Sequence, residues 1–442
     1  MGTIYETNPN TGNARAILVG ANLSMGEERF QRSMTELKDL AEACNLEVVG
    51  TVTQLVQSAD HGTLIGSGKI EEIKNEIYVK DADIIVFSET LSPLQIRNLE
   101  KAFDTEVIDR TGLILQIFSS RARTRESKLQ VESAQLQYML PRLAGMRAEL
   151  SRQGGGGQGG SGRLSNKGSG EKKIELDRRH IEKRISELRK ELENVERERT
   201  TQRGKRINSG MIKVSLVGYT NAGKSTLMNK LLEIYGGEDA EEKKVFEKDM
   251  LFATLDTTVR KINAPNHRPF LLSDTVGFID ELPHTLVKAF RSTLDEVKYS
   301  DVLLEVIDYS DPDYKAHLDV TTKTLAEIGA GDIPIIYVYN KVDIADGAMV
   351  ELPFVRDDSI YMSAKQGIGI EELLDLIETT LKSGTVECDM LIPYSEGGVL
   401  AALNNTAIIS NTEYLPEGTK IHVSCSKANA GRYEKYMISH YL

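Results

Sequence analysis

Two glycines and a lysine at fixed spacing give one stretch of the chain the composition of a phosphate-binding loop. Its residues are Gly218, Tyr219, Thr220, Asn221, Ala222, Gly223, Lys224 and Ser225, followed by Thr226. Glycines let the backbone curl around an anion without Cβ clashes, so that successive N–H groups and a helix N-terminus face the phosphates. In this pattern the lysine reaches the β- and γ-phosphates, and the serine hydroxyl binds Mg²⁺. An apolar run before the stretch and helical spacing after it supply the strand–loop–helix context that the pattern requires.

Three later segments indicate that the bound base is guanine, and two of them would meet the base itself. The first follows an apolar run typical of a parallel strand and contains Asn340, Lys341 and Asp343. An aspartate there accepts two N–H bonds from the guanine edge, which adenine cannot donate. Asn340 is expected to brace the loop, and the stem of Lys341 is expected to lie on the base. The second segment, expected to place a backbone N–H near the guanine O6, contains Ser363, Ala364 and Lys365.

The third segment serves the metal and the γ-phosphate. Asp274 and Gly277 follow another apolar, strand-like run. The aspartate is expected to hold Mg²⁺ through a water molecule, and the glycine N–H is expected to meet the γ-phosphate. Each pattern alone is weak, but all of them, in this order and each at a strand end, fit the binding edge of an open α/β sheet. The sequence therefore predicts a GTP site with Mg²⁺ at Ser225 and Asp274.

A loop must also close over the γ-phosphate between the phosphate loop and Asp274, and residues 251–258 occupy that place. A threonine there supplies a hydroxyl to Mg²⁺ and a backbone N–H to the γ-phosphate in the GTP state. We assign this role to Thr254. Thr257 and Thr258 are the competitors, and the third interpretation is that all of them are loop hydroxyls. The predicted catalytic residues are Lys224, Thr254 and Gly277.

Two positions bear on how hydrolysis would proceed. Phe278 follows Gly277, where many GTPases carry a glutamine that orients the attacking water. Phenylalanine cannot do this, so unaided turnover is expected to be slow; a core or partner-facing role for Phe278 is compatible with this. The side-chain oxygen of Asn221 is a candidate ligand for K⁺, which would place positive charge beside the phosphates. The alternative is that Asn221 only caps the loop.

The composition is that of an ordinary globular protein. The chain has 442 residues, long enough for about three domains, of which 40% are hydrophobic and 27% charged. No apolar run approaches the roughly 20 residues of a membrane span, although association with a membrane surface stays open. The first residues lack a signal-peptide pattern, and Cys44, Cys388 and Cys425 show no metal-binding spacing. We therefore expect a cytoplasmic protein with free thiols.

Strand and helix patterns alternate from residue 13 to about 120. Strand-like runs lie at 16–19, 48–52, 84–87 and 107–108, and amphipathic stretches lie at 30–44, 70–79 and 93–103. This alternation predicts an α/β domain over residues 1–120 with a parallel sheet. Residues 66–69 are similar to a phosphate loop but lack its spacing. We interpret them as a turn that starts a helix, with an anion site as the alternative.

Residues 126–150 and 171–200 show helical spacing. The second stretch carries an a/d seam of Ile174, Ile181, Ile185, Leu188, Leu192 and Val195. The residues of the first stretch that could face it are Leu129, Leu136, Met139, Leu140, Leu143 and Leu150. Pro141 is expected to kink that helix. Nine glycines among residues 151–170 complete the prediction of an antiparallel helical hairpin over residues 121–207 with a glycine-rich tip.

Charge sets this hairpin apart. Residues 120–206 contain 22 Lys or Arg and 12 Asp or Glu, whereas the whole chain carries a net charge of −12. A cationic arm on an anionic body suits a polyanionic partner such as nucleic acid. The alternative is an exposed coiled coil, which would normally be balanced in sign. The candidate phosphate contacts are Arg121, Arg123, Arg125, Arg152, Arg163, Lys167, Arg178 and Arg179.

The fold class that follows is a multidomain α/β protein. A GTPase (G) domain with a parallel or mixed sheet is expected over residues 208–384. A small α+β domain is expected over residues 385–442, with strands near 389–393, 407–409 and 421–423 and a helix near 398–404. A monomer is expected, although the a/d seam could also pair between two chains.

Along nearly its full length the chain resembles the HflX family of ribosome-associated GTPases. The segments that carry the resemblance are residues 109–115, 121–126, 129–132, 150–156, 175–179, 218–225 and 252–256. The resemblance implies binding to the large ribosomal subunit, contact of the hairpin with rRNA near the peptidyl-transferase centre, and GTP-driven splitting of stalled or idle ribosomes. It also implies the hydrophobic residue after Gly277 and activation of hydrolysis by the ribosome. The chain departs from the family in its longer glycine-rich tip and in Thr257, which stands where a proline is common.

Other functions fit the same residues. A GTPase for assembly of the large subunit would use the same chemistry on precursor particles. In an RNA chaperone, the basic hairpin would remodel RNA and GTP would only gate it. A scaffold that docks a partner through the hairpin seam would need no turnover at all.

Overall fold

The computed structural model describes residues 13–23, 26–152, 167–208, 211–236, 251–252, 255, 257–280, 296–345, 351–382 and 385–441. Its contacts divide the chain into two compact units, with the boundary between Val195 and Glu196. Among the described residues, no helix is both long and apolar enough to cross a membrane. The division into four domains stays a prediction.

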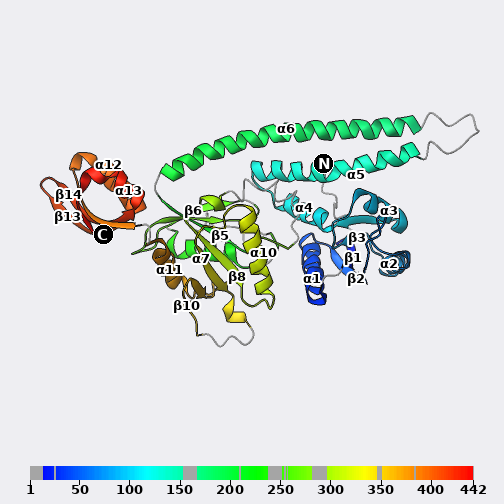
Figure 1. Cartoon of the computed structure of the whole chain (residues 1–442), viewed down its shortest axis with the longest axis horizontal. Coiled ribbons are helices and arrows are strands. Elements are labelled where there is room, and N and C mark those ends of the chain that lie inside the picture. Colours follow the sequence, from blue (N-terminus) through cyan, green and yellow to red (C-terminus); the bar gives the residue numbers. More distant parts are fainter. Residues whose placement is uncertain are drawn as a thin grey trace, which may run out of the picture. The chain divides into compact units, whose positions relative to one another are not determined.

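The first unit is built on a parallel sheet (Figure 1). The strand order is β2-β1-β3-β4, with β1 at Arg15–Asn22, β2 at Glu47–Leu55, β3 at Ile84–Phe87 and β4 at Glu106–Asp109. The connecting helices are α1 (Glu27–Ala43), α2 (Ser67–Lys80) and α3 (Pro93–Phe103). Apolar residues such as Val19, Ile85 and Phe87 are buried at the sheet. The predicted α/β architecture is confirmed.

Local sequence explains where these helices start. Ser92 caps α3: its Oγ accepts the Gln95 N–H at 3.2 Å, and the Gln95 side chain accepts the Ser92 N–H at 2.9 Å. This capping box, with Pro93 at the first helical position, satisfies backbone donors that a helix start leaves open. Gly66 precedes α2, and Lys69 pairs with Glu72 at 2.7 Å in the first turn. Residues 66–69 are thus a helix start, as interpreted.

A further helix, α4 (Arg110–Arg121), follows β4 directly and was not predicted. Asp109 caps it and accepts the Gly112 N–H at 2.8 Å. The helix is buried continuously from Arg110 to Leu115 and again at Ile117 and Phe118. A helix that is buried all round shows no amphipathic period, which is why its spacing gave no signal.

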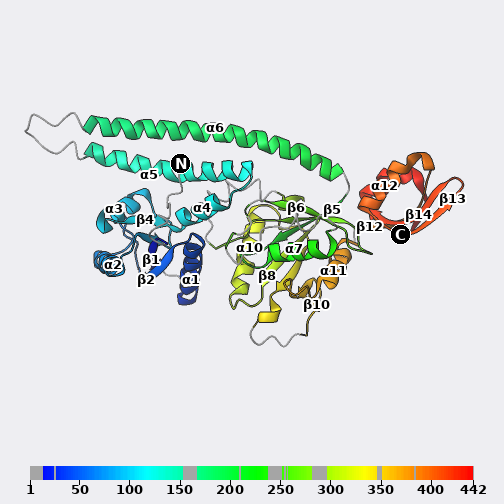
Figure 2. The ribbon, with the colours of Figure 1, turned by 180° about the vertical axis from the view of Figure 1, so that it is seen from behind.

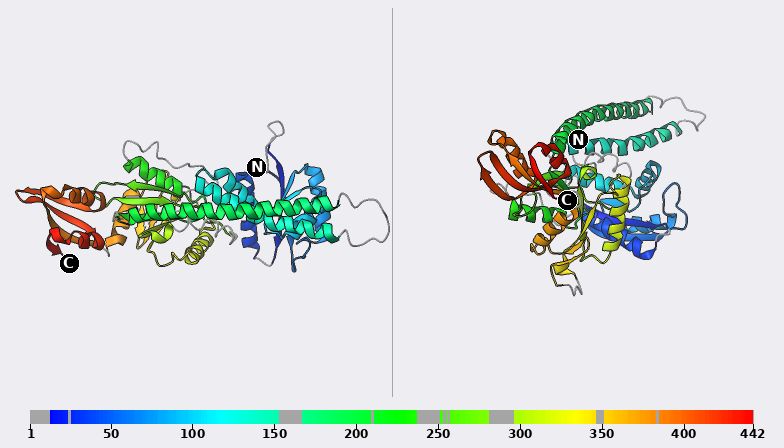
Figure 3. Two further views of the ribbon diagram at one scale, coloured as in Figure 1. Left: turned by 90° about the horizontal axis from the view of Figure 1, so that it is seen from above. Right: turned by 60° about the vertical axis from the view of Figure 1, so that its left-hand side comes forward.

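Two long helices follow, α5 (Arg125–Arg152) and α6 (Lys167–Asn208), and they lie side by side in Figures 1 and 3. Their seam contains Leu129, Leu136, Leu140, Ile181, Ile185, Leu188, Leu192 and Val195. Arg184 of α6 bonds Glu132 of α5 through two nitrogens, at 2.8 and 2.9 Å. The helix α5 continues through Pro141. The predicted a/d pairing therefore occurs within one chain.

The second unit contains a seven-stranded sheet of order β10-β11-β9-β8-β5-β7-β6. The strands are β5 (Ile212–Val217), β6 (Thr258–Ile262), β7 (Phe270–Asp274), β8 (Val302–Asp308), β9 (Ile335–Asn340), β10 (Phe354–Arg356) and β11 (Ser359–Tyr361). The central five are parallel, and β6 and β10 add antiparallel edges. The helices are α7 (Lys224–Tyr235), α10 (Tyr314–Glu327) and α11 (Ile370–Lys382). Figures 1 and 2 show α10 on one face of the sheet and α7 with α11 on the other.

The C-terminal residues form a separate antiparallel sheet of order β13-β14-β12-β15. Its elements are β12 (Thr385–Ile392), α12 (Gly397–Thr406), β13 (Ile408–Leu415), β14 (Gly418–Ser426), α13 (Lys427–Arg432) and β15 (Met437–Tyr441). Cys388 and Cys425 are buried free thiols in its core. This is the predicted small α+β fold.

Glu305 is a buried acid in the middle of β8. It is 1% exposed, and neither carboxyl oxygen has a hydrogen-bond partner. The nearby Thr321 hydroxyl donates instead to the His317 carbonyl at 3.0 Å. Burial raises the pKa of Glu305 from 4.5 to about 7, with the Thr321 hydroxyl opposing the shift. The folded domain therefore holds a proton here that the unfolded chain releases.

This proton makes Glu305→Gln a stabilising change whose size depends on pH. The folded-state pKa lies above the unfolded one, so wild-type stability falls as pH rises from about 4.5 to about 7 and then levels off. We expect Glu305→Gln to stabilise the domain by about 3 kcal/mol at pH 8 and by almost nothing at pH 5. Hydrogen–deuterium exchange of β8 peptides, compared with wild type at each pH, measures this. An equal effect at both pH values would contradict the expectation.

Candidate nucleotide-binding site

The phosphate loop joins β5 to α7 and depends on its two glycines. Gly218 has a φ of +132°, and a Cβ there would lie 2.3 Å from the Val306 carbonyl oxygen. Gly223 has a φ of +95°, and its Cβ would lie 2.2 Å from Nδ2 of Asn340. Both backbone angles and both contacts exclude larger residues. The loop is thus folded tightly enough for its N–H groups to face one anion.

Lys224 starts α7 and is 7% exposed. Its Nζ donates to the carbonyl oxygens of Gly218, at 3.0 Å, and Tyr219, at 2.6 Å. Burial lowers the pKa of Lys224 to about 8, and the charge of Asp274 opposes this shift. A phosphate beside Nζ would favour the ammonium form, because an opposite charge stabilises it.

This shift predicts that nucleotide affinity depends on pH. Without nucleotide, Lys224 loses its proton near pH 8, whereas a bound phosphate holds the proton on, so binding above pH 8 takes up a proton. The dissociation constant for GDP should therefore rise about eightfold between pH 7.5 and pH 9. Fluorescence titration with a labelled GDP measures it. A flat profile would show that Lys224 stays charged without the phosphate.

The residues predicted for Mg²⁺ touch one another. Ser225 Oγ donates to Oδ2 of Asp274 at 2.7 Å, and Asp274 is 0% exposed at the end of β7. A hydroxyl and a carboxylate side by side are the hard oxygen donors that Mg²⁺ takes, with phosphate oxygens and water completing the shell. The next residue, Thr275, is also buried and donates to the Leu216 carbonyl at 2.7 Å, which fixes this strand end to β5. The donor set fits the ion.

The structure describes only some of the threonines that were considered for closing over the γ-phosphate. Thr254 lies outside the described residues. Thr258 begins β6, pairs with Asp274 in the ladder and directs its hydroxyl to the sulfur of Met228 at 3.6 Å. Thr258 is a strand residue in this arrangement, and the choice of Thr254 over its competitors stays a prediction. Thr257, the residue before β6, is partly exposed.

The segment after Asp274 lies directly against the phosphate loop. A Cβ on Gly277 would lie 2.8 Å from Cα of Thr220 and 3.0 Å from Nζ of Lys224, so only glycine fits. The next residue, Phe278, accepts the Thr220 N–H at 2.8 Å and donates its own N–H to the Gly218 carbonyl at 3.1 Å. Its side chain is 2% exposed. Phe278 is therefore part of the core here and cannot orient a water molecule.

Asn340 connects the phosphate loop to the loop of Ser363. Its Nδ2 donates to the Ala222 carbonyl and its Oδ1 accepts the Ala364 N–H, both at 2.9 Å. Asn340 is 2% exposed, and Ser363 and Ala364 are fully buried. The expected brace is thus present between loops that are far apart in sequence. Because the Ala364 N–H is occupied, the N–H of exposed Lys365 is the next donor available to a guanine O6.

The remaining base-contact residues lie at the same edge. Asp343 is exposed and accepts a bond from Nε2 of Gln366 at 3.1 Å. Lys341 has a φ of 61°, and its Nζ donates to Asp308 at 2.7 Å. Asp308 ends β8, and the sequence reasoning missed it. The rule that ligands bind at the carboxyl ends of parallel strands would have found it.

Tyr219 is a second residue whose role was missed. Its ring stacks on His317 of α10, with centroids 3.9 Å apart and planes 11° apart. Its hydroxyl accepts the Asp280 N–H at 2.9 Å. Tyr219 therefore ties the phosphate loop to α10 and to the residues that follow Phe278. Asn221, the K⁺ candidate, is exposed and has a φ of 59°.

The basic residues predicted to contact nucleic acid lie along α4, α5 and α6. Arg123 is exposed between α4 and α5, and Arg125 is exposed at the first position of α5. Arg178 and Arg179 pair with Glu182 and Glu175 one helical turn away, at 2.9 and 3.2 Å. Such exposed pairs contribute only about 0.3–0.5 kcal/mol, so a phosphate can replace them. Arg121 is partly buried at the end of α4. The structure does not describe Arg163 or the side chains of Arg152 and Lys167.

Three family models match consecutive parts of the chain. They are GTP-binding GTPase N-terminal over residues 31–119, GTP-binding GTPase Middle Region over residues 121–206 and 50S ribosome-binding GTPase over residues 213–341. The last match covers the phosphate loop and the Asp274 segment, and it ends at Lys341. A solved GTP-binding protein from Sulfolobus solfataricus in complex with GDP is 26% identical, covers 84% of this chain and 99% of that one, and gives a TM-score of 0.43.

Relatives of high identity cover almost the whole chain. GTPase HflX of Lacrimispora saccharolytica is 44% identical over 404 residues, which is 91% of this chain and 92% of that protein. GTPase HflX of Caldanaerobacter subterraneus subsp. tengcongensis is 41% identical over 425 residues, which is 96% of this chain and 94% of that protein. These alignments cover more than nine tenths of the chain. The chain therefore belongs to the HflX family of GTPases.

Proposed function

We propose that this GTPase binds the large ribosomal subunit through its basic α5–α6 hairpin and uses GTP to dissociate stalled or idle ribosomes in the cytoplasm. The observation that carries the proposal is a guanine-nucleotide site and a strongly cationic two-helix arm in one chain. Residues 120–206 hold 22 Lys or Arg against 12 Asp or Glu. Ribosomal RNA is the polyanion that suits such an arm. The matched family description, 50S ribosome-binding GTPase, supports the same partner.

Each side chain of the site has a proposed task. Lys224 neutralises charge on the β- and γ-phosphates, and the Gly277 N–H holds the γ-phosphate. Asp343 accepts two bonds from guanine, and Asn340 keeps that loop at a fixed distance from the phosphate loop. When bound at Ser225 and Asp274, Mg²⁺ supplies further positive charge at the phosphates. Thr254 completes this set when GTP orders its segment.

Hydrolysis is proposed to depend on the ribosome. Phe278 is buried and holds the phosphate loop through two backbone bonds, so the side chain at this position cannot orient water. Asn221 is the proposed ligand of a K⁺ ion that adds charge beside the phosphates. Loss of the γ-phosphate releases the contacts of Gly277 and Thr254, which lowers affinity for the ribosome and lets the protein leave.

A splitting assay tests the proposal and separates it from its rivals. Intact ribosomes are mixed with the protein and GTP, and dissociation is followed by light scattering. We expect dissociation by wild type and by Lys38→Glu, a control charge change on α1, and strongly reduced dissociation by Arg179→Glu on the hairpin. An assembly GTPase would leave intact ribosomes whole. An RNA chaperone would unwind a naked RNA duplex equally well after Asp343→Ala.

A further inference from the structure

The connection between β9 and β11 of the seven-stranded sheet is unusual. The strands β9 and β11 are neighbours and parallel, and parallel neighbours are usually connected through an α-helix that covers the sheet. The described residues between them hold only a short 3-10 turn, Val342–Ile344, and the edge strand β10. In this part of the chain the structure describes no helix that packs over the face where such a connection would run.

Aromatic side chains occupy that face instead. Ile336, Val338, Ile360 and Met362 point into the core shared with α7 and α11, so alternate residues of β9 and β11 point to the opposite side. Tyr339 and Tyr361 stack there, with ring centroids 4.5 Å apart and planes 9° apart. We call the group of Tyr309, Tyr314, Tyr339, Phe354 and Tyr361 the tyrosine face.

The tyrosine face is one connected set of rings. Tyr309 meets Tyr339 and Tyr361 edge-on, at centroid distances of 5.8 and 5.3 Å. Tyr314 at the start of α10 lies 5.3 Å from Tyr309, and Phe354 of β10 lies 5.8 Å from Tyr361. The tyrosines are partly exposed, and Phe354 is 44% exposed. The rings therefore support one another while part of their surface faces solvent.

Acidic residues outnumber basic ones in the two segments that carry Tyr309, Tyr314, Phe354 and Tyr361, although Asp308 pairs with Lys341 and Asp357 with Arg356. Residues 308–315 and 354–361 contain five carboxylates, Asp308, Asp311, Asp313, Asp357 and Asp358, and two cations, Lys315 and Arg356. An acidic rim repels a polyanion such as RNA and attracts a cationic partner. Guanidinium groups stack flat on aromatic rings and bind carboxylates through two parallel bonds, whereas an ammonium group is a strongly hydrated point charge. The chemistry of the face thus favours arginine over lysine.

We propose that the tyrosine face is a docking surface for an arginine-bearing segment of a partner protein. The segment would lie along the edge strand β10, whose three residues are all exposed, with guanidinium groups on Tyr361 and Phe354 and in pairs with Asp357 and Asp358. An extended segment can add to a free sheet edge through its backbone. The face contains none of the residues predicted to bind the nucleotide, although Asp308 of its rim pairs with Lys341 at 2.7 Å.

Binding of short peptides tests the proposal. The probes are fluorescent alternating Gly-Arg and Gly-Lys dodecapeptides, titrated by anisotropy into the full chain with GDP. Arginine peptide should bind about fivefold to tenfold more tightly than lysine peptide, the range that stacking on exposed rings contributes. Phe354→Ser and Tyr361→Leu should bring that ratio close to one. Tyr414→Leu, a control at a ring that is 74% exposed on β13, should leave it unchanged.

A second variant tests the acidic rim without disturbing the rings. Asp357 has a φ of 51° in the β10–β11 turn, a conformation that asparagine also tolerates, so Asp357→Asn with Asp358→Asn keeps the turn. This double variant should bind both peptides about threefold to fivefold more weakly than wild type. Asp81→Asn, at an exposed aspartate with a φ of 47°, is the matched control. Unchanged affinity for labelled GDP shows that each variant is folded.

Two results would overturn the proposal. One is equal affinity for both peptides in wild type, or a preference that survives loss of Phe354 and Tyr361. The other concerns a single-stranded RNA dodecamer. If Tyr361→Leu weakened its binding as much as it weakens binding of the arginine peptide, the face would be assigned to RNA.

Discussion

Asn340→Ala should weaken GDP and GTP binding by at least about a hundredfold. The substitution removes both bonds of the brace, to the Ala222 carbonyl and to the Ala364 N–H. Each leaves a buried backbone group without its partner, at a cost of about 1–3 kcal/mol. The two loops that should hold phosphate and base then lose their fixed spacing. Titration with labelled GDP measures the loss, since a hundredfold change corresponds to about 2.7 kcal/mol.

A matched control is available for this variant. Asn429 is also 2% exposed and donates to Thr406 at 3.1 Å in the C-terminal sheet domain, away from the proposed nucleotide site. Asn429→Ala should leave GDP affinity unchanged even where it lowers stability. If Asn340→Ala bound GDP within about threefold of wild type, the brace would not matter for binding, and the spacing of the loops would have to be fixed by other contacts.

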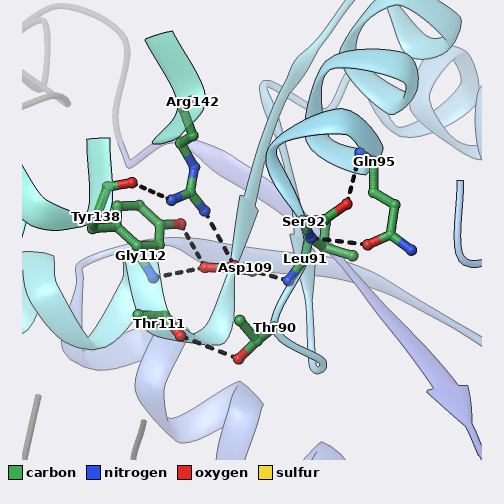
Figure 4. Close-up of polar contacts among 9 residues, drawn as sticks. All are labelled: Thr90, Leu91, Ser92, Gln95, Asp109, Thr111, Gly112, Tyr138 and Arg142. Carbon is green, nitrogen blue, oxygen red and sulfur yellow. Dashed lines mark hydrogen bonds and ion pairs between the residues drawn. The ribbon is translucent and has the colours of Figure 1, made fainter. Parts of the chain in front are cut away.

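Asp109→Ala should destabilise the N-terminal unit by about 3–5 kcal/mol. Asp109 is 0% exposed at the end of β4, and Figure 4 shows the groups that converge on it. Oδ1 accepts the Gly112 N–H at 2.8 Å and the Tyr138 hydroxyl at 2.5 Å; Oδ2 accepts the Leu91 N–H at 3.0 Å and pairs with Arg142 at 3.2 Å. Removing one partner of such a pair leaves an uncompensated charge, which sets this magnitude.

The location of Asp109 makes the expected damage specific. Its four partners come from the loop before α3, from the first turn of α4 and from the middle of α5, so this carboxylate joins the end of β4 to α5 of the hairpin. Hydrogen–deuterium exchange should show faster exchange in α4 and α5 than in β1. Asp60→Ala is the control, because Asp60 accepts the N–H groups of Gly62 and Thr63 at an exposed turn, and it should cause a much smaller loss. If the amides of α4 were as well protected from exchange in Asp109→Ala as in the wild-type protein, this expectation would be contradicted.

Much of the fold could be predicted because its elements have a strong period. The strands around Ile85 and Leu18 are short apolar runs, and the α5–α6 seam repeats at a/d spacing, so local pattern and tertiary packing agree. The helix α4 was not predicted, because it is buried on all sides and therefore shows no amphipathic period. The tyrosine cluster beside β9 and β11 also left no periodic signal, since it depends on how distant strands align.

The candidate site was predictable where one residue type is needed at one place. Gly218 and Gly223 are required by backbone angle and close contact, and Lys224 by the phosphate. Contacts between distant side chains were not predictable in the same way. The pairing of Lys341 with Asp308 and the stacking of Tyr219 on His317 depend on tertiary packing, and no spacing rule joins residues that are 33 or 98 positions apart.

The most direct test of a ribosome-activated GTPase is hydrolysis of GTP in K⁺ buffer, with and without purified large ribosomal subunits, beside Asn340→Ala. Buried Phe278 predicts slow turnover of the protein alone, and the subunits should accelerate it about a hundredfold, equal to about 2.7 kcal/mol off the barrier. Asn340→Ala should show no stimulation. Subunits that bind the wild-type protein without accelerating hydrolysis would contradict the account.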